Sequence, residues 1–334
     1  MRAWLLETPA PIESAPLELR ALADPVPGPG EIVLEVSVCG LCRTDLHVIE
    51  GELAAQRPAV VPGHQVVGRV SALGPGASRF ALGQRVGVAW LWRACGACPQ
   101  CRSGRENLCR APRFTGWHEH GGYAERVRVP EAFAYALPES LSDESAAPLL
   151  CAGIIGYRAL LRSGLRPGST LGLWGFGSSA HIALQVARHW GARVFVVTRE
   201  ATHRELARAL GAEWAGDLGE RPPERLSAAI NFAPVGSLVP EALEALAPGG
   251  TLACAGIHMT AIPELDYQKH LFEERTLTSV TANTREDGRA LLALAEEVPL
   301  RPRTTSFDFA RANEALLALK RGLIAGSGVL RVRT

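Results

Sequence analysis

Residues 170–190 read TLGLWGFGSSAHIALQVARHW and carry the pattern that decides the fold. An apolar strand is expected over residues 170–174, a glycine-containing turn follows it, and an apolar helix is expected over residues 181–190. Gly191 then leads into a second buried strand over residues 194–197. A strand, a glycine turn, a helix and a second strand in this order are what a dinucleotide-binding unit requires. The Gly-x-Gly-x-x-Ala string is therefore informative here, although it is weak alone.

Three small residues of this turn have distinct expected roles. Gly175 makes the tight turn, Gly177 lets the backbone approach a pyrophosphate, and Ala180 keeps the helix close to the strand. The phosphates are expected at the start of the helix, where free backbone N–H groups and the helix dipole favour anions. A purely structural turn is the alternative.

The residues after the second strand bear on the choice of coenzyme. Thr198 and Arg199 stand where a carboxylate normally accepts the adenosine ribose hydroxyls. Without that carboxylate, Arg199 can instead bind a 2′-phosphate. We therefore favour NADP over NAD, while the adjacent Glu200 and a merely solvated Arg199 keep NAD as the alternative.

The rest of the chain has two regions with different secondary-structure patterns. Strands over residues 31–38 and 65–73, separated by Pro- and Gly-rich turns, predict an all-β opening. From Ser142 onward helices and strands alternate, which predicts a parallel sheet with helices on both faces. The expected elements there are a helix carrying residues 146–161 and capped by Ser142, a capping box at Thr202 and Glu205, strands over residues 228–232, 250–255 and 328–332, and helices over residues 286–297 and 309–321.

Composition limits the setting of the protein. At 334 residues the chain is long enough for two domains. Its 35 basic and 34 acidic residues give a net charge of +1, which favours neither nucleic acid nor an anionic membrane as partner. We find no apolar run long enough to cross a bilayer and no signal-peptide core at the N-terminus, so a cytoplasmic location is expected. The eight cysteines are then more plausibly metal ligands than disulfides.

Four of these cysteines form the most specific local signal. Cys95, Cys98, Cys101 and Cys109 are close enough in sequence for their thiolates to turn inward around one zinc ion. Four sulfurs leave zinc no open position, so this site is expected to brace a loop rather than to do chemistry. Four unrelated cysteines, an iron–sulfur cluster and a nucleic-acid-binding knuckle are the alternatives; the neutral charge and the nucleotide turn argue against the last.

A second supply of ligands lies in residues 38–65. Cys42, Thr44, Asp45, His47 and His64 offer a thiol, a hydroxyl, a carboxylate and two imidazoles within a few dozen residues. One cysteine and one histidine hold zinc only if further ligands arrive from elsewhere in the chain.

These motifs together resemble the zinc-dependent alcohol dehydrogenases of the medium-chain dehydrogenase/reductase superfamily, over essentially the whole chain. Matched onto this sequence, the family's catalytic zinc ligands are Cys42, His64 and Cys151, and the four-cysteine group is its structural zinc site. The resemblance implies an α/β protein with two zinc ions per chain and a homo-oligomer. It implies a GroES-like β-barrel catalytic domain over residues 1–152 and 284–334 and a doubly wound Rossmann coenzyme domain over residues 153–283.

The resemblance also implies roles near the catalytic zinc. Three ligands leave one position for substrate, where zinc raises the acidity of an alcohol or polarises a carbonyl for hydride transfer. By resemblance the proton passes from the alcohol to Thr44, through the coenzyme ribose and to His47, while Asp45 orients His64 and Arg43 meets the pyrophosphate. Each of these residues also has a purely structural alternative. Thr44 and Asp45 could cap the start of a helix, and Arg43 and His47 could simply be exposed.

The resemblance also bears on the substrate, and the sequence departs from the family at one position beside a zinc ligand. Ile49, Leu53 and Trp90 fall where family members line the substrate pocket, which favours a hydrophobic primary alcohol or aldehyde. Gln65 stands where the family commonly has glutamate beside a zinc ligand, and a neutral amide cannot serve as an anionic ligand. Polyol or secondary-alcohol oxidation, a zinc-free quinone reductase and an inactive zinc and nucleotide binding protein are the other readings.

Overall fold

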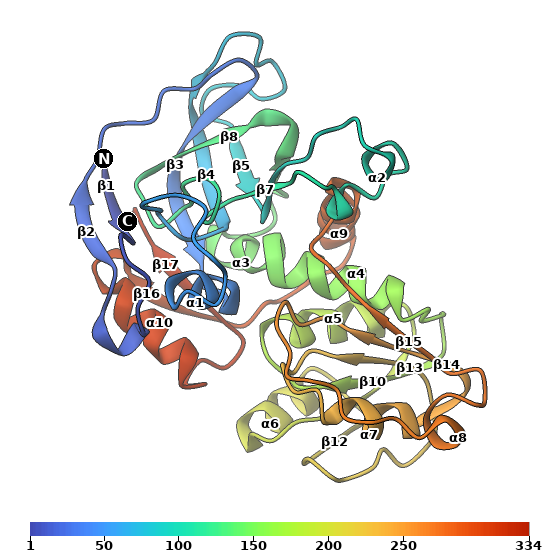
Figure 1. Cartoon of the computed structure of the whole chain (residues 1–334). Coiled ribbons are helices and arrows are strands. Elements are labelled where there is room, and N and C mark those ends of the chain that lie inside the picture. The colour runs from blue at the N-terminus through green and yellow to red at the C-terminus, as the bar shows by residue number, and fades with distance from the viewer. Residues whose placement is uncertain (334) are drawn as a thin grey trace. The chain divides into compact units, whose positions relative to one another are not determined.

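The computed structural model describes residues 1–333, which form two compact units (Figure 1). Unit 1 comprises residues 1–151, 282–297 and 302 onward, and unit 2 comprises residues 152–281 and 298–301. We propose that these units are the two predicted domains, whose boundaries at 152/153 and 283/284 stay a prediction. No helix within residues 1–333 has the length and apolar character that a bilayer crossing needs.

Unit 2 is built on a six-stranded parallel sheet in the order β12-β11-β10-β13-β14-β15. This is the doubly wound order, in which the chain moves outward from β10 to one edge, returns beside β10 and moves to the other edge. The predicted α/β class and parallel sheet are confirmed. The strands are β10 Thr170–Trp174, β11 Arg193–Val197, β12 Trp214–Gly216, β13 Leu226–Asn231, β14 Leu246–Cys254 and β15 Thr276–Ser279.

Helices cover both faces of this sheet, with α4 and α5 on one side of the strands and α7 and α8 on the other (Figure 1). The helix after the glycine turn begins at Ser178, three residues earlier than expected, and its inward side chains are fully buried. The helices of this unit are α4 Ile154–Arg162, α5 Ser178–His189, α6 Ala201–Ala209, α7 Leu238–Glu244 and α8 Tyr267–His270.

The predicted capping box at Thr202 and Glu205 is wrong. Helix α6 begins at Ala201 with Glu200 as its N-cap residue, so Thr202 lies inside the first turn. The N-cap is therefore two residues earlier than predicted. Strand β11 ends at Val197 and the helix begins at Ala201, so residue 202 is already helical and cannot be the N-cap.

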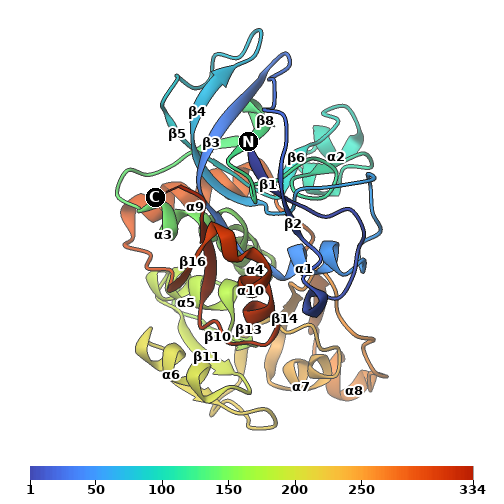
Figure 2. The ribbon, with the colours of Figure 1, turned by 90° about the vertical axis from the view of Figure 1, so that its left-hand side faces the viewer.

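Unit 1 contains a mostly antiparallel sheet in the order β16-β17-β3-β4-β5-β9, with β8 pairing β3. Strands β3, β4 and β5 lie side by side (Figure 2), and the predicted strand over residues 65–73 matches β4. The strands are β3 Glu31–Gly40, β4 Gln65–Leu73, β5 Arg85–Val88, β8 Arg126–Pro130, β9 Ala134–Ala136, β16 Thr304–Asp308 and β17 Ser327–Arg331. Two small sheets add β1 Arg2–Leu5 with β2 Glu18–Ala21, and β6 Leu91–Arg93 with β7 Arg113–Phe114.

The C-terminal segment belongs to unit 1 because β17 pairs with β3. Val329 lies opposite Gly40 in this antiparallel pair, and the Trp4 indole donates to the carbonyl of Phe309 over 2.8 Å. The predicted helix over residues 309–321 is divided into a short 3-10 turn and α10. The helices of this unit are η1 Ile12–Ser14, α1 Arg43–Ile49, α2 Pro99–Arg102, η2 Glu106–Leu108, η3 Glu131–Phe133, α3 Asp143–Pro148, α9 Arg285–Glu297, η5 Phe309–Arg311 and α10 Ala312–Lys320.

The helix predicted to carry residues 146–161 is not one continuous α-helix. Ser142 does cap it, because its hydroxyl accepts from the backbone N–H of Ser145, but α3 ends at Pro148. A π-helical turn, Leu149–Gly153, then leads into α4. Proline has no N–H to continue the α-helical hydrogen bonds, and single π turns are frequent at functional sites.

Candidate active site and metal centres

Cys42, His64 and Cys151 converge although they lie far apart in sequence. The Cys42 and Cys151 Sγ atoms are 4.0 Å apart, and His64 Nε2 lies 3.2 Å from Cys151 Sγ. All three ligand atoms lie within 4.8 Å of one another. Around a tetrahedral zinc, two thiolate sulfurs are separated by about 3.8 Å and a sulfur and a nitrogen by about 3.5 Å. The group therefore fits one zinc ion with little movement.

Each of these three candidate ligands is positioned by local structure. Cys42 is the N-cap residue of α1, in extended conformation, and its Sγ accepts from the backbone N–H of Thr44 over 3.5 Å. His64 follows Gly63, whose φ of +94° turns the chain just before β4. Cys151 lies in the π turn between α3 and α4.

The Asp45 carboxylate lies behind His64 and is 1% exposed. Its Oδ1 is 2.8 Å from His64 Nδ1, and its Oδ2 accepts from the backbone N–H of Cys42 over 2.9 Å. Oδ2 also accepts from the Tyr123 hydroxyl over 2.8 Å. A carboxylate on one ring nitrogen fixes the tautomer of the imidazole, which directs the other nitrogen toward a metal.

The charges of Asp45, His64 and the two cysteines affect one another because these groups are buried and close together. Burial lowers the pKa of His64, but the charge and hydrogen bond of Asp45 outweigh it and raise that pKa to about 10. The hydrogen bond from Cys151 holds the pKa of Cys42 well below its usual range, and the same contact raises the pKa of Cys151. These shifts favour a thiolate at Cys42 beside a protonated His64, and a bound metal takes the place of the protons on His64 Nε2 and Cys151 Sγ.

Three aromatic rings form a stack beside His64. Trp90 meets the imidazole edge to face at a centroid distance of 4.9 Å. It stacks on Phe114 at 4.8 Å with 14° between planes, and on Trp117 at 6.0 Å with 8°. Phe114 was not expected at this site. Of the other two predicted pocket residues, Ile49 is fully buried and Leu53 is half-buried in the same core.

The predicted proton-relay residues lie on helix α1. Thr44 is buried at the first turn, and His47 is three residues later, so both occupy one side of the helix. His47 Nδ1 pairs with the Glu52 carboxylate. Nothing in the local pattern pointed to Glu52, because it follows the end of α1.

Two other predicted site residues lie in unit 1. Arg43, expected at the pyrophosphate, is exposed at the start of α1. The Gln65 amide is buried, and its Oε1 has no hydrogen-bond partner among residues 1–333.

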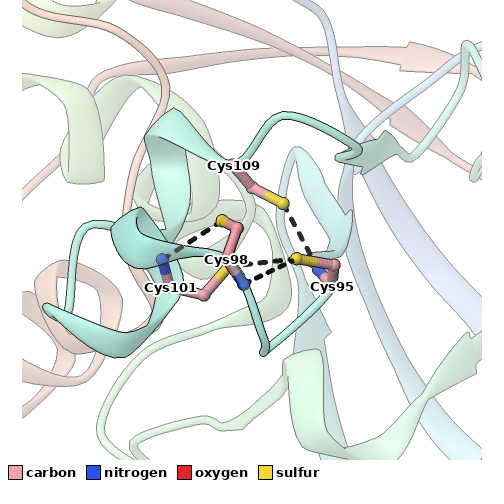
Figure 3. A group of neighbouring side chains, drawn as sticks. All are labelled: Cys95, Cys98, Cys101 and Cys109. Carbon is pink, nitrogen blue, oxygen red and sulfur yellow. Dashed lines mark hydrogen bonds between the residues drawn. The ribbon is translucent and has the colours of Figure 1, made fainter.

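The four cysteines of the second group point toward one another (Figure 3). Cys95 Sγ and Cys101 Sγ are 3.8 Å apart, the distance that a shared zinc requires. Backbone N–H groups of Cys95, Cys98 and Cys101 donate to the sulfurs of Cys109, Cys95 and Cys98. The bond from the Cys101 N–H lowers the pKa of Cys98 to about 6, because it stabilises the thiolate.

An ion pair between the buried Glu106 and the half-buried Arg285 ties this cysteine loop to helix α9. Glu106, 8% exposed, accepts from the Arg285 backbone N–H over 2.8 Å and from Arg285 Nη2 over 2.6 Å. The Arg285 guanidinium also lies over the Phe133 ring at 4.4 Å. Burial acts to raise the pKa of Glu106, but the hydrogen bonds and charge of Arg285 lower it overall.

We expect Glu106→Gln to lower the free energy of unfolding by about 2 kcal/mol at pH 7, because it leaves the Arg285 charge unpaired. Stability from a carboxyl with a lowered pKa is present above its ordinary value of 4.5 and is lost as the pH falls through the lowered pKa. The difference in the free energy of unfolding between variant and wild type should therefore vanish in strong acid. Denaturant unfolding across pH measures it, and Glu286→Gln, an exposed ion pair on the same helix, is the matched control.

The glycine turn of unit 2 has the geometry of a phosphate site. Gly175 has φ of +81°, and a Cβ there would lie 3.0 Å from the backbone nitrogen of Ala233. A Cβ at Gly177 would meet nothing within 4 Å, so its backbone faces open space at the start of α5. Ala180 is fully buried against the sheet. These residues fit a pyrophosphate at the helix N-terminus.

The end of β11 carries an exposed arginine. Thr198 is 2% exposed and Arg199 projects outward, with its guanidinium on Glu200 Oε1 at 2.7 Å. Arg204 Nη1 donates to the carbonyls of both Thr198 and Arg199 and pairs with Asp217 at 3.2 Å. No carboxylate occupies position 198 or 199, while Glu200 balances the charge of Arg199.

Two family models match the chain. The "Alcohol dehydrogenase GroES-like domain" matches residues 28–139, and the "Zinc-binding dehydrogenase" domain matches residues 180–297. A Mycobacterium tuberculosis protein named "Probable alcohol dehydrogenase AdhA" is 53% identical, over 99% of this chain and 97% of that protein.

Solved structures are similar over the whole chain. The structure of a cinnamyl alcohol dehydrogenase from Sorghum bicolor has a TM-score of 0.89 and 28% identity, covering 99% of this chain and 97% of that one. The acetophenone reductase of Geotrichum candidum, in complex with NAD, has a TM-score of 0.89 and 25% identity, with coverage of 99% and 97%.

Proposed function

Because the chain belongs to the zinc-dependent alcohol dehydrogenases of the medium-chain dehydrogenase/reductase superfamily, we propose that it transfers hydride between NADP(H) and a hydrophobic alcohol or aldehyde. The observation that supports this proposal is the convergence of Cys42, His64 and Cys151 with Asp45 behind the imidazole. A zinc ion bound by three such ligands supplies a Lewis acid with one position open to substrate.

The chain's own residues have four roles in this proposal. Asp45 holds the proton on His64 Nδ1, so that Nε2 is free to bind metal. Thr44 Oγ1 accepts a hydrogen bond from the substrate hydroxyl, and His47, paired with Glu52, takes up the proton that the alcohol releases and gives it to solvent. The stacked rings beside His64 exclude water from the reacting atoms.

A second zinc ion is proposed at Cys95, Cys98, Cys101 and Cys109, where four sulfurs leave no open position. In unit 2, the coenzyme pyrophosphate is proposed at Gly175, Gly177 and the start of α5. A homo-oligomer is proposed from the family and agrees with β15 standing at the edge of its sheet.

The preference for NADP rests on Thr198 and Arg199. Residue 198 offers no carboxylate to repel a 2′-phosphate, and Arg199, whose side chain is 77% exposed, is available to bind one. The ion pair to Glu200 must open for this to happen, which is a small cost for an exposed pair.

Arg199→Ala is expected to lower the ratio of kcat/KM for NADPH to that for NADH by about tenfold to a hundredfold, because a charge-assisted hydrogen bond to phosphate is lost. Steady-state kinetics with both coenzymes measure the ratio. Arg221→Ala is the matched control, since the Arg221 side chain is 78% exposed and also pairs with a glutamate. An unchanged ratio in Arg199→Ala would assign the preference to other residues.

The substrate class is proposed from the ring stack. Trp90, Phe114 and Trp117 present flat apolar surface beside His64, which suits a hydrophobic aldehyde or alcohol better than a polyol. A ketone or secondary alcohol is the second candidate, because the similar Geotrichum protein is named an acetophenone reductase.

Metal content and turnover together test the proposal. Purified protein should contain two zinc ions per chain and oxidise NADPH with hydrophobic aldehydes, and chelation should abolish turnover. Benzaldehyde, acetophenone and glyceraldehyde distinguish the primary, secondary and polyol classes. One zinc per chain with no turnover on any substrate would favour a binding protein and contradict the proposed reaction.

A further inference from the structure

Tyr123 is a fully buried side chain next to the three-ligand group. Its backbone N–H donates to the Pro62 carbonyl over 3.0 Å, and its carbonyl accepts from the Trp4 N–H over 2.8 Å. The ring packs over Gly63, because a Cβ on that glycine would lie 2.5 Å from Tyr123 Cδ1. Gly63 has φ of +94°, so both its conformation and the ring above it require glycine directly before His64.

The Tyr123 hydroxyl donates to Asp45 Oδ2 over 2.8 Å. The same oxygen accepts from the Cys42 backbone N–H, while Oδ1 faces His64 Nδ1 at 2.8 Å and the Gly63 N–H at 3.3 Å. Donors on both oxygens fix the rotation of the carboxylate as well as its position. Without the hydroxyl, Oδ2 keeps only the Cys42 backbone N–H as donor, so the carboxylate is held less firmly against His64.

We propose that Tyr123 is a positioning residue of the three-ligand metal site, acting through Asp45 to hold His64 in the orientation that binds metal. The inference rests on the proposed zinc at Cys42, His64 and Cys151. The hydroxyl stays protonated and able to donate, because burial and the neighbouring Asp45 raise the pKa of Tyr123 well above its usual value.

Tyr123→Phe removes the one oxygen atom and keeps the ring over Gly63. Zinc release to excess chelator is followed with a colorimetric indicator, and the four-cysteine site of the same chain is the internal reference. We expect the three-ligand site to lose zinc about tenfold to a hundredfold faster than in wild type, as for other outer-shell partners of zinc ligands, while the four-cysteine site is unchanged. Tyr135→Phe, at another buried tyrosine of unit 1, is the matched control and should release zinc at the wild-type rates.

A double-mutant cycle with Asp45→Asn separates positioning from general packing. If Tyr123 acts through Asp45, adding Tyr123→Phe to Asp45→Asn should change the zinc release rate less than twofold. Substituting cobalt for zinc gives a second readout, since the visible bands of a Cys42–His64–Cys151 site should shift in Tyr123→Phe and those of the four-cysteine site should not.

Three results would overturn the inference. Wild-type release rates in Tyr123→Phe would show that the hydroxyl does not matter, and equal acceleration at both zinc sites, or in Tyr135→Phe, would show a merely structural role. A wild-type protein with zinc at the four cysteines alone would contradict the proposed function and this inference together. That last result is recognised before any variant is made.

Discussion

Replacing Cys151 with serine is expected to reduce kcat about a thousandfold or more and to leave one zinc ion per chain. Serine is a poor zinc ligand, and His64 and Cys42 alone offer two of the three ligands that a catalytic zinc needs. A catalytic metal supplies several kcal/mol of transition-state stabilisation, and each 1.4 kcal/mol is a factor of ten in rate. Metal analysis and steady-state kinetics on the same preparation measure both effects.

Cys254→Ser is the matched control for this variant. Cys254 is also a buried cysteine, 7% exposed, but it ends β14 in the core of unit 2. Its replacement should keep two zinc ions and kcat within a few-fold of wild type. If Cys151→Ser retained two zinc ions and full turnover, the assignment of Cys151 as a metal ligand would be wrong.

Replacing Cys101 with serine is expected to remove the other zinc ion and to lower the Tm by about 10 °C. Loss of a structural metal costs about 4 kcal/mol or more, and about 1 kcal/mol corresponds to 2–4 °C in a unit of this size. The remaining thiolates at Cys95, Cys98 and Cys109 would then repel one another without a cation between them.

Thermal scans at one fixed rate measure this effect, since unfolding of a chain of this size can be irreversible. Limited proteolysis should cut Cys101→Ser within the loop from Cys95 to Cys109, which is short of regular structure apart from α2 and η2. The Cys254→Ser variant again serves as control. An unchanged Tm with one zinc lost would mean that the four-cysteine site does not stabilise the fold.

Local periodicity was a good guide to the fold. The strand expected over residues 170–174 matches β10, and the alternation that follows matches the observed parallel sheet, because buried strands and amphipathic helices are specified within short windows. The failures lie at helix boundaries. Neither the interruption at Pro148 and the π turn nor the N-cap at Glu200 follows from periodicity, since both depend on how the chain enters or leaves the helix.

The two proposed metal sites differ in how far the residues alone predicted them. The four cysteines lie within fifteen positions, so their spacing alone pointed to one site. Cys42 and Cys151 are 109 positions apart, and Cys151 was placed with Cys42 only through the family resemblance. Tyr123, 78 positions from Asp45, had no local signal, because its contact with Asp45 arises from the tertiary packing of the loop before β8 against helix α1.

The division between the two units falls immediately after Cys151. Cys42, His64 and Cys151, together with Asp45, therefore belong to one unit, whereas Gly175, Gly177, Thr198 and Arg199 belong to the other. A recombination event that exchanged residues 152–281 would replace the proposed coenzyme determinants and leave every proposed zinc ligand in place. The proposed metal sites and the proposed coenzyme preference can therefore be exchanged independently of one another. The junction after Cys151 is a natural place to graft a foreign coenzyme unit.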